Sequence, residues 1–355
     1  VWRVSRAYRE IFACLIRRQI HNVYFLSAEM LEYIKKEDLS YRKERLFGTG
    51  MYFLRKDVPV EAGHNVFAMR GGGNEEYHWR FSQKMLDKPI PDFACDMFAG
   101  RSALEEFEEQ YGKYHVLQGR TPAAGDENAS YAVYMARSHV DRAVLPGELP
   151  SWVIPIRVGA ALTDEDIAGV KDNTGDHISE RNGNYSECTA IYWMWKNAPK
   201  TDYIGLCHYR RHFDLEEAGI FELGQREIDV LVTSPSFVYE TVKAFFSDMA
   251  PKEDMDVLLD VIEERRPQYR SSANAFFASR FYPPCNLFVM KYDLFMEYCE
   301  FLFSVTFGIE DYYNRIGFHR TDRYMGYLVE CLLGIFLMKN KERLKIAYTD
   351  MRFYI

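Results

Sequence analysis

The sequence predicts an α/β protein in which a sheet is flanked by helices. Over about the last 220 residues, short β-branched and aromatic runs alternate with longer apolar or amphipathic runs, as strands and helices packed in layers do. The chain has 355 residues, of which 48% are apolar. A chain of this length and composition is long enough for two domains, each with its own core.

Five segments of this region are short enough and apolar enough to be strands. They are Tyr131–Ala136, Asp202–Tyr209, Ile228–Thr233, Asn286–Met290 and Leu344–Tyr348, with a further apolar run at Trp152–Leu162. Longer runs predict helices at Glu187–Asn197, Asp254–Arg265, Lys291–Phe307 and Arg323–Lys339. Ligands of α/β sheets bind beyond the carboxyl ends of strands, which directs attention to the residues that follow Leu206.

Residues 1–128 predict a separate and smaller N-terminal region, α/β or irregular, to which no function is assigned. The small, polar stretch Thr121–Ser130 has the composition of a linker, so we place the second domain at residues 129–355. In the N-terminal region, Leu46–Phe53 contains a Gly-x-Gly but lacks the third glycine of a dinucleotide-binding turn, and we interpret it as a strand and turn. We interpret Gly71–Gly73 as a loop and Ala103–Tyr111 as a solvated helix.

Composition argues against several classes of protein. A formal net charge of -8 does not suit a general nucleic-acid binder, because such proteins neutralise phosphates with a basic surface. No run approaches the roughly 18 to 20 uninterrupted apolar residues of a membrane span, and the first residues lack the order of a secretory signal. The seven cysteines are scattered without the spacing of a zinc site or a disulfide framework, so we expect reduced thiols.

The most informative segment is Asp202–Asp214, DYIGLCHYRRHFD, where an apolar strand runs directly into charge. Adjacent arginines at a strand end point to opposite faces unless the chain bends, so one of Arg210 and Arg211 can face a cleft. Arginine suits a diphosphate because its planar guanidinium binds two oxygens at once. His208 could act as an acid, a base, a hydrogen-bond donor to phosphate or a metal ligand. A salt-bridged surface group is the alternative interpretation.

Two further segments contain polar residues near apolar elements. In Asp172–Ser179, DNTGDHIS, two carboxylates and a histidine surround a glycine, which suits a ribose, a base or a metal; Asx-turn chemistry explains the same residues without a ligand. Glu187 opens a strongly apolar helix, where its charge also suits the helix dipole.

Read together, SERNGNYSECTAIYWMWKN and DYIGLCHYRRHF resemble a bacterial family known as domain of unknown function 4422. The resemblance runs from about Tyr131 to Ile355, through IPIRVGAAL, DNTGDHIS, NLFVMKYDLFMEYCEFLF and RYMGYLVECLLGIFL. The family occurs in gene clusters for capsular polysaccharide and exopolysaccharide. It is grouped with glycosyltransferases of the GT-A type, so the resemblance implies a GT-A-like, Rossmann-type mixed sheet and a nucleotide-sugar donor.

The resemblance also implies places for individual residues. By similarity to the GT-A layout, donor-binding residues include Ala136, Arg137 and His139 at the end of the first strand. Asp172, Asp176 and Glu187 line the same pocket, and Tyr209, Arg210 and Arg211 complete it. The strand Asp202–Cys207 matches the one that usually delivers a D-x-D metal motif, but His208, Tyr209 and Arg210 stand there instead.

That departure leaves two arrangements open. Either Arg210 and Arg211 neutralise the diphosphate without a metal, or a divalent ion is held by Asp172, Asp176 and a histidine. We favour the arrangement without a metal or other cofactor, since two fixed cations can replace the electrostatic role of an ion. The segment Phe281–Cys285, FYPPC, also departs from the family, in which small polar residues and a histidine stand before the strand.

The expected function is transfer of a sugar from a nucleotide-diphosphate donor to the hydroxyl of a glycan or lipid-linked acceptor. His208 would donate a hydrogen bond to the leaving diphosphate. An inverting route needs a carboxylate to take the proton of the acceptor, and Asp322 and Glu330 are the catalytic candidates. Asp322 could instead cap its helix, and Glu330 could pair with an arginine.

The alternative is a non-catalytic subunit that binds a nucleotide sugar or a carbohydrate. A nucleotidyltransferase is disfavoured, because the sequence offers no glycine-rich phosphate loop with a lysine. In either role we expect a cytoplasmic protein without a nucleic-acid partner, in peripheral contact with the inner face of the cell membrane.

Overall fold

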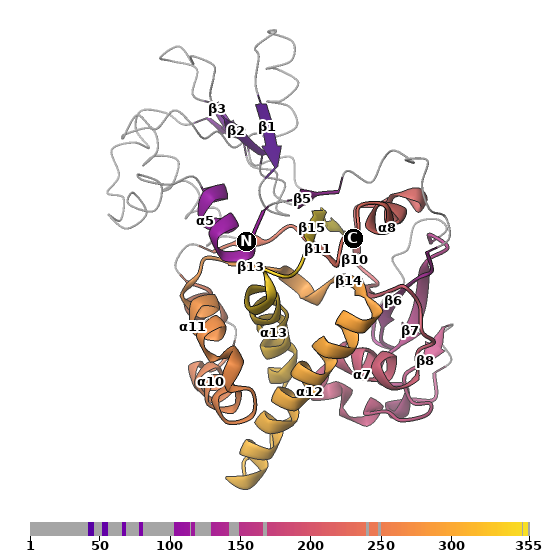
Figure 1. Ribbon diagram of the computed structural model, residues 1–355. Coiled ribbons are helices and arrows are strands. Elements are labelled where there is room, and N and C mark those ends of the chain that lie inside the picture. The colour runs from indigo at the N-terminus through magenta and orange to yellow at the C-terminus, as the bar shows by residue number, and fades with distance from the viewer. Residues whose placement is uncertain are drawn as a thin grey trace. The chain divides into compact units, whose positions relative to one another are not determined.

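The computed structural model describes residues 42–45, 52–55, 66–68, 78–80, 103–113, 115–117, 129–141, 149–165, 169–238, 241–247, 250–349 and 351–353 (Figure 1). The chain divides into two compact units. The first comprises Val1–Glu109 and Ser234–Tyr239, and the second comprises Gln110–Thr233 and Glu240–Ile355. Gly71–Gly73, residues 46–51 and residues 121–128 of the predicted linker lie outside the described residues, and the predicted boundary at residue 129 stays a prediction.

The described part of the first unit contains two antiparallel strand pairs. β1 (Arg42–Arg45) pairs with β2 (Tyr52–Arg55), and β3 (Val66–Ala68) pairs with β4 (His78–Arg80). Strand β12 (Ser236–Phe237) also belongs to this unit. Helix α5 (Ala103–Tyr111) begins in the first unit and ends in the second, and its bounds confirm the helix predicted from the sequence.

The second unit is built on one mixed sheet. Its strand order is β5, β15, β11, β14, β9, β6, β7, β8. The strands span His115–Val116 (β5), Tyr131–Arg137 (β6), Val153–Arg157 (β7), Val170–Lys171 (β8), Tyr203–His208 (β9), Val230–Thr233 (β11), Phe288–Lys291 (β14) and Ile346–Thr349 (β15). Two short strands, β10 (Arg211–Phe213) and β16 (Met351–Phe353), pair with each other, and β10 also pairs with β9. Strand β13 (Phe281–Tyr282) completes the set in this unit.

β14 runs against its neighbours inside this sheet, and the short strand β10 is antiparallel to β9 and β16. β6, β7, β8 and β9 are mutually parallel, and so are β5, β11 and β15. β14 lies between β9 and β11 and is antiparallel to both. The end of β9 therefore lies beside the beginning of β14, and residues that precede one strand meet residues that follow the other.

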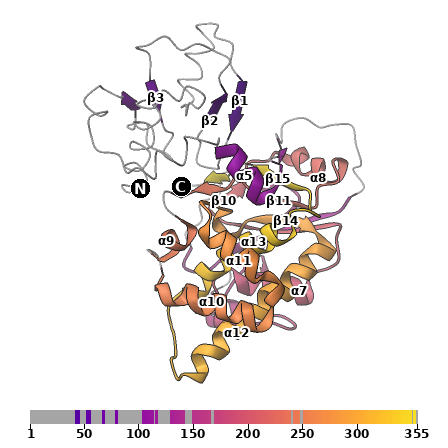
Figure 2. The same cartoon turned by 60° about the vertical axis from the view of Figure 1, so that its left-hand side comes forward.

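The helices of the second unit are α6 (Asn182–Tyr185), α7 (Cys188–Asn197), α8 (Glu222–Gln225), α9 (Val242–Ser247), α10 (Lys252–Arg265), α11 (Arg270–Ala278), α12 (Tyr292–Arg315) and α13 (Tyr324–Asn340). Short 3-10 turns span η1 (Ala160–Leu162), η2 (Ser179–Arg181), η3 (Glu217–Phe221), η4 (Pro267–Tyr269) and η5 (Pro284–Asn286). Helix α13 packs against both α11 and α12, and α10 packs against α12, as Figure 2 shows. This mixed sheet flanked by helices confirms the predicted fold class.

Each face of the sheet buries a different set of side chains. On the helix-covered face, the ring of Tyr134 lies 5.8 Å from that of Trp193 in α7, and the ring of Phe288 lies 5.5 Å from that of Tyr298 in α12. Residues that alternate with these, such as Val133 and Cys207, point to the opposite face, as the period of a strand requires.

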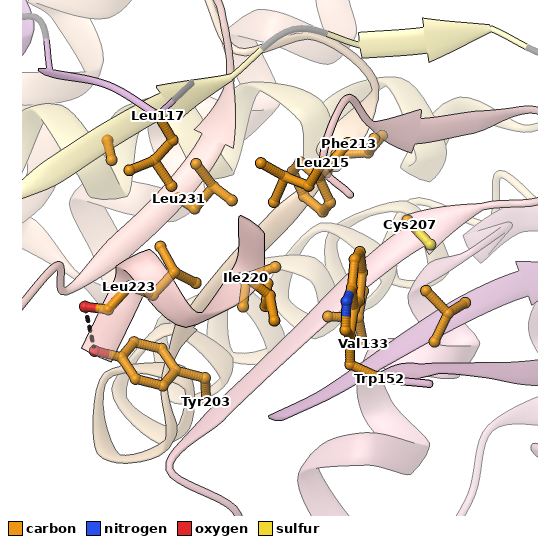
Figure 3. Close-up of a cluster of buried hydrophobic side chains, with 14 of the residues drawn as sticks. Leu117, Val133, Trp152, Tyr203, Cys207, Phe213, Leu215, Ile220, Leu223 and Leu231 are labelled. Carbon is orange, nitrogen blue, oxygen red and sulfur yellow. Dashed lines mark hydrogen bonds between the residues drawn. The ribbon is translucent and has the colours of Figure 1, made fainter. Parts of the chain in front are cut away.

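The opposite face packs against the segment that contains η3 and α8. Leu215, Ile220 and Leu223 from this segment meet the strand residues in one buried apolar cluster (Figure 3). The hydroxyl of Tyr203 donates to the carbonyl oxygen of Leu223 at 3.1 Å, so the one polar atom of that ring is satisfied inside the cluster. Burial on both faces explains why β9 is apolar along almost its whole length.

Among the residues that the structure describes, no helix combines the length and the apolar composition that a membrane span requires.

Candidate active site

A tight turn at the end of β9 forms the first part of the candidate site. β9 ends at His208 and β10 begins at Arg211, so Tyr209 and Arg210 alone make the turn. Arg211 pairs with His208 across this hairpin, and paired residues of antiparallel strands project from the same face. His208 lies two residues beyond Leu206, which is paired with both Tyr134 and Phe288. The side chains of His208 and Arg211 therefore belong to the helix-covered face.

The other two residues of the HYRR segment lie elsewhere. Tyr209 packs against the apolar cluster on the opposite face. Arg210 is exposed at the tip of the turn, with its guanidinium carbon 5.9 Å from the centre of the Tyr209 ring. The two arginines that are adjacent in the sequence thus occupy different surroundings.

The loop before β14 forms the second part of the site. Cys285 and Asn286 follow two prolines and both adopt left-handed backbone, with φ of 63° and 54°. This conformation turns the Cys285 N–H toward helix α13, where it donates to Oε2 of Glu330 at 3.1 Å. A non-glycine residue with positive φ stores strain, and such strain gathers at functional sites.

The start of α7 forms the third part. Ser186 also has positive φ, at 51°, and its carbonyl accepts a hydrogen bond of 2.7 Å from Nδ2 of Asn182. Of the four non-glycine residues with positive φ in the described segments, Ser186, Cys285 and Asn286 lie at this site. Glu187 follows as the N-cap residue of α7, yet its carboxylate makes no capping hydrogen bond.

Helix α13 contributes residues two turns apart. Arg323 is its N-cap residue and donates from Nε to Oγ of Ser186 at 2.9 Å. Glu330 lies seven residues further, on the same side of the helix and about 10 Å along its axis. Gly326 lies between them, and a Cβ there would stand 3.0 Å from Oγ of Ser186. The missing side chain lets α13 approach the start of α7 closely.

These groups perturb one another, which shows that they lie within electrostatic reach. Burial and the negative charge of Glu187 raise the pKa of Glu330 to about 7, against the opposing effects of the Cys285 N–H, Arg211 and Arg323. Burial also raises the pKa of Glu187, while Arg323 and Arg211 lower it. A carboxyl group with a pKa near neutrality can exchange protons under working conditions.

Asn286 is a further neighbour of Glu187. Its side chain lowers the pKa of the Glu187 carboxyl as a hydrogen-bonding group does, although its buried Nδ2 makes no hydrogen bond of regular geometry. We interpret the contact as a long and imperfect one. Glu187, His208, Arg211, Asn286, Arg323 and Glu330 together are called the strand-end cluster below.

His208 is held neutral within this cluster. Burial, together with the positive charges of Arg211 and Arg323 and a smaller effect of His212, lowers its pKa to about 3. A neutral imidazole at neutral pH is a poor general acid and a good hydrogen-bond donor or acceptor. Of the roles that the sequence left open for His208, hydrogen bonding to a ligand suits these surroundings best.

Several buried nitrogen atoms at the ends of β6, β7 and β9 have no hydrogen-bond partner among the residues that the structure describes. Buried polar groups are normally paired, so each exception calls for an explanation such as an absent ligand. The register places Arg137 beside Arg157 and Ala136 beside His208 at the carboxyl ends of these parallel strands. The unpartnered atoms are Nε of Arg137, Nδ1 of His139, Nε of Arg157 and Nε2 of His208.

The predicted acidic residues of the 172–179 segment accept hydrogen bonds from neighbouring parts of the protein. Asp172 is fully buried and accepts from the backbone N–H groups of Gly159 and Ala160, at 2.9 and 3.0 Å, and from the hydroxyl of Ser179. Asp176 is exposed and accepts from the hydroxyl of Tyr192 at 3.0 Å. The Asp172 carboxylate thus shapes the loop after β7, and a donor contact by either residue stays a prediction.

Asp322 differs from Glu330 in the groups that bind its carboxylate. Its carboxylate binds Arg320, which also binds Asp254, and it does not cap α13, since Arg323 is the N-cap residue. Hydrogen bonds from Arg320 lower the pKa of Asp322. A carboxylate with a lowered pKa is a weak base, so Glu330 is the stronger of the two catalytic candidates.

Sequence reasoning missed four residues of this region. Arg157, Ser186, Asn286 and Arg323 were not selected, although Arg323 is the last charged residue before an apolar helix. Its position could have been used to select it, because the first residues of a buried helix lie at the edge of the buried layer, where a ligand can reach them. Ser186 and Asn286 gave none, since their backbone conformations arise from tertiary packing.

Among the segments that the structure describes, no group of three or more His, Cys, Asp or Glu side chains is arranged to hold a metal ion.

A pocket of about 490 Å³ lies at the other end of β9, between the residues before Tyr203 and those after Lys291. Its charged groups are already paired. Lys291 binds Asp229 at 2.7 Å, Lys200 lies 3.6 Å from Asp293, and Asp202 accepts from Ser130. We therefore place the candidate site at the strand-end cluster, where buried nitrogens of His208 and Asn286 have no regular hydrogen bond among the described residues.

The comparisons with known proteins agree on the fold. A solved structure described as the apo form of WbbM, a bifunctional glycosyltransferase, matches with a TM-score of 0.57 and 24% sequence identity. The match covers 63% of this chain and 45% of that one, so the chain spans less than half of the larger protein. None of the curated proteins matches the sequence. The model of a family described as a domain of unknown function, DUF4422, matches residues 139–341, more than half of the chain, and the chain belongs to that family.

Proposed function

We propose that the second unit is a glycosyltransferase that moves a sugar from a nucleotide-diphosphate donor to a glycan hydroxyl. The observation that carries this proposal is Glu330, which accepts a hydrogen bond from the Cys285 N–H and whose pKa, about 7, responds to the charges of Arg211 and Arg323. The similarity in fold to a protein described as a glycosyltransferase supports it.

The proposed reaction makes one bond and breaks one. The acceptor oxygen bonds to the anomeric carbon of the sugar as the bond from that carbon to the diphosphate breaks. In an inverting route, Glu330 takes the proton of the acceptor hydroxyl. Arg211 stabilises the negative charge that develops on the leaving diphosphate, and His208 donates a hydrogen bond to it.

The finer assignment follows from the family and from the same residues. We propose a GT-A type of donor binding, with the nucleotide at the ends of β6 and β7, where Arg137, His139 and Arg157 have unpartnered buried nitrogens. We propose a role in capsular polysaccharide or exopolysaccharide synthesis, with a glycan or lipid-linked acceptor. Fixed arginines would supply the charge that a divalent ion supplies elsewhere.

The experiment is release of nucleoside diphosphate from a panel of nucleotide sugars, with and without simple sugar acceptors. We expect release with one donor, little effect of a chelator, and a loss of roughly 100-fold or more in Glu330→Gln. Glu342→Gln is the matched control, because that side chain is 91% exposed and lies just beyond the same helix. Binding of a donor without any release would favour a non-catalytic nucleotide-sugar binding subunit instead.

A further inference from the structure

We propose that Arg323, together with Arg211, binds the diphosphate of the donor, and that Ser186 orients its guanidinium for this purpose. The inference rests on the proposed function, because it names the second cation of the same site. In this proposal the role expected of Arg210, the neighbour of Arg211 in the sequence, belongs to Arg323, which is more than a hundred positions away.

The guanidinium of Arg323 is fixed at one side and open at the other. Its Nε donates to Oγ of Ser186 at 2.9 Å. Neither terminal nitrogen makes a hydrogen bond, and no carboxylate lies within ion-pair distance, among the residues that the structure describes. The side chain is exposed at the mouth of the cluster. Two parallel N–H groups are thus free to bind two phosphate oxygens.

Arg211 and Arg323 act on the same groups. Both lower the pKa of His208, of Glu187 and of Glu330, so their charges converge on one region. The charges that lower the pKa of His208 are all positive, and they come from Arg211, Arg323 and His212. Arg210 is not among the main causes of these shifts.

The surroundings hold Arg323 in place before a ligand arrives. Ser186 is kept in its left-handed conformation by Asn182, and Gly326 allows α13 to approach it. A guanidinium that is already oriented loses less conformational entropy when it binds a phosphate. The starts of α7 and α13 both lie at this point, and the partial positive charge of helix N-termini adds to that of the arginines.

Binding of nucleoside diphosphates tests the inference without any need for turnover. The probe is whichever of UDP, GDP, CDP, dTDP and ADP binds the full chain most tightly in isothermal titration calorimetry, compared with its nucleoside. We expect Arg323→Gln to weaken diphosphate binding about 10-fold or more, and nucleoside binding little, because charged hydrogen bonds to phosphate are lost. Arg323→Lys should recover part of the affinity, since it restores the charge without the planar fork.

Two comparison variants define the result. Arg315→Gln is the matched control, because Arg315 is exposed at the end of α12, and it should leave affinity unchanged. Ser186→Ala keeps the arginine but frees its guanidinium, and should weaken diphosphate binding several-fold, which also serves if Arg323 variants fold poorly.

The outcomes separate the two proposals. If the unaltered chain binds no nucleoside diphosphate, the proposed function fails. If it binds one, and Arg323→Gln and Ser186→Ala bind it equally well, or Arg210→Gln weakens binding more than Arg323→Gln does, the assignment of Arg323 is overturned.

Discussion

Two groups of charged side chains lie next to each other at the start of α13 and are built differently. In the Arg320 cluster, Arg320 binds Asp254 and Asp322, and Asp254 also accepts from the hydroxyl of Tyr313. In the strand-end cluster, Arg323 makes one hydrogen bond to Ser186. Arg320 and Arg323 are three residues apart, yet the side chain of Arg320 is 7% exposed and that of Arg323 is open to solvent.

The difference separates a structural role from a functional one. In the Arg320 cluster each charged group forms an ion pair inside the protein, although Oδ2 of Asp254 makes no hydrogen bond among the described residues. In the strand-end cluster, Nε2 of His208 and Nδ2 of Asn286 are buried without a regular hydrogen bond, and the terminal nitrogens of Arg323 make none, among the residues that the structure describes. Unsatisfied polar groups are costly to fold, and they persist where a ligand completes them.

The largest expected effect is a loss of stability from Asp254→Ala, a substitution that breaks the Arg320 cluster. Asp254→Ala removes a carboxylate that is 1% exposed and leaves Arg320 with Asp322 as its carboxylate partner. We expect the free energy of unfolding, measured by urea titration, to fall by about 3 kcal/mol, because a buried ion pair loses one of its members. Nucleoside diphosphate affinity of the folded fraction should stay the same. Weakened binding with unchanged stability would contradict the structural assignment of this cluster.

The next largest effect is an increase in the free energy of unfolding, expected for Glu330→Gln. The pKa of Glu330 is raised to about 7 in the folded chain, so the unfolded chain binds fewer protons at this group between its ordinary pKa and that value. Glu330 therefore destabilises the fold increasingly as the pH rises through this window. We expect Glu330→Gln to raise the free energy of unfolding by roughly 2 kcal/mol at pH 8, and by less at pH 5.

Urea titrations of both chains at the two pH values measure this gain. An equal gain at both values, or a loss at pH 8, would show that Glu330 is a structural residue. A variant that is more stable and less active is the expected signature of a catalytic group in a strained site.

The smallest effect concerns the pH profile. The charge of Glu187 raises the pKa of Glu330, and Glu187 also shares the two arginines with it. Glu187→Gln should lower the pKa of Glu330, so the rising limb of kcat/KM should move to lower pH. Glu217→Gln is the control, because that exposed residue binds Ser151 away from the cluster. If the rising limb of kcat/KM stays in place or moves to higher pH, the two carboxyl groups are not coupled.

The central strands and the long helices were predictable because their patterns are local. The apolar run of β9, the aromatic run of α12 and the apolar run of α13 each exceed what a loop would contain. Glu330 could be selected as a site residue for the same reason, because a carboxylate within so apolar a helix must be paired or functional. The strand β5 was not predictable, because its two residues are defined only by pairing with β15.

The second cation could not be found from the sequence. Arg210 and Arg211 are equivalent in a strand-end motif, and only the bend at Tyr209 separates them. Arg323 joins Arg211 through the packing of α13 against the start of α7, a contact between residues 137 positions apart. The roles of Asp172 and Asp322 were undetermined for a similar reason, because their partners are set by tertiary structure.

The reversed direction of β14 determines which loop of the sheet reaches the strand-end cluster. Because this strand enters the sheet at the functional edge, the loop in front of it, rather than behind it, delivers Cys285 and Asn286 to the strand-end cluster. That loop connects α11 and β13 to the strand and carries none of the sheet's hydrogen bonds. Substitutions in this loop would therefore act on Glu330, through the Cys285 N–H, and on Glu187, through Asn286, while the pairing of the strands stays the same.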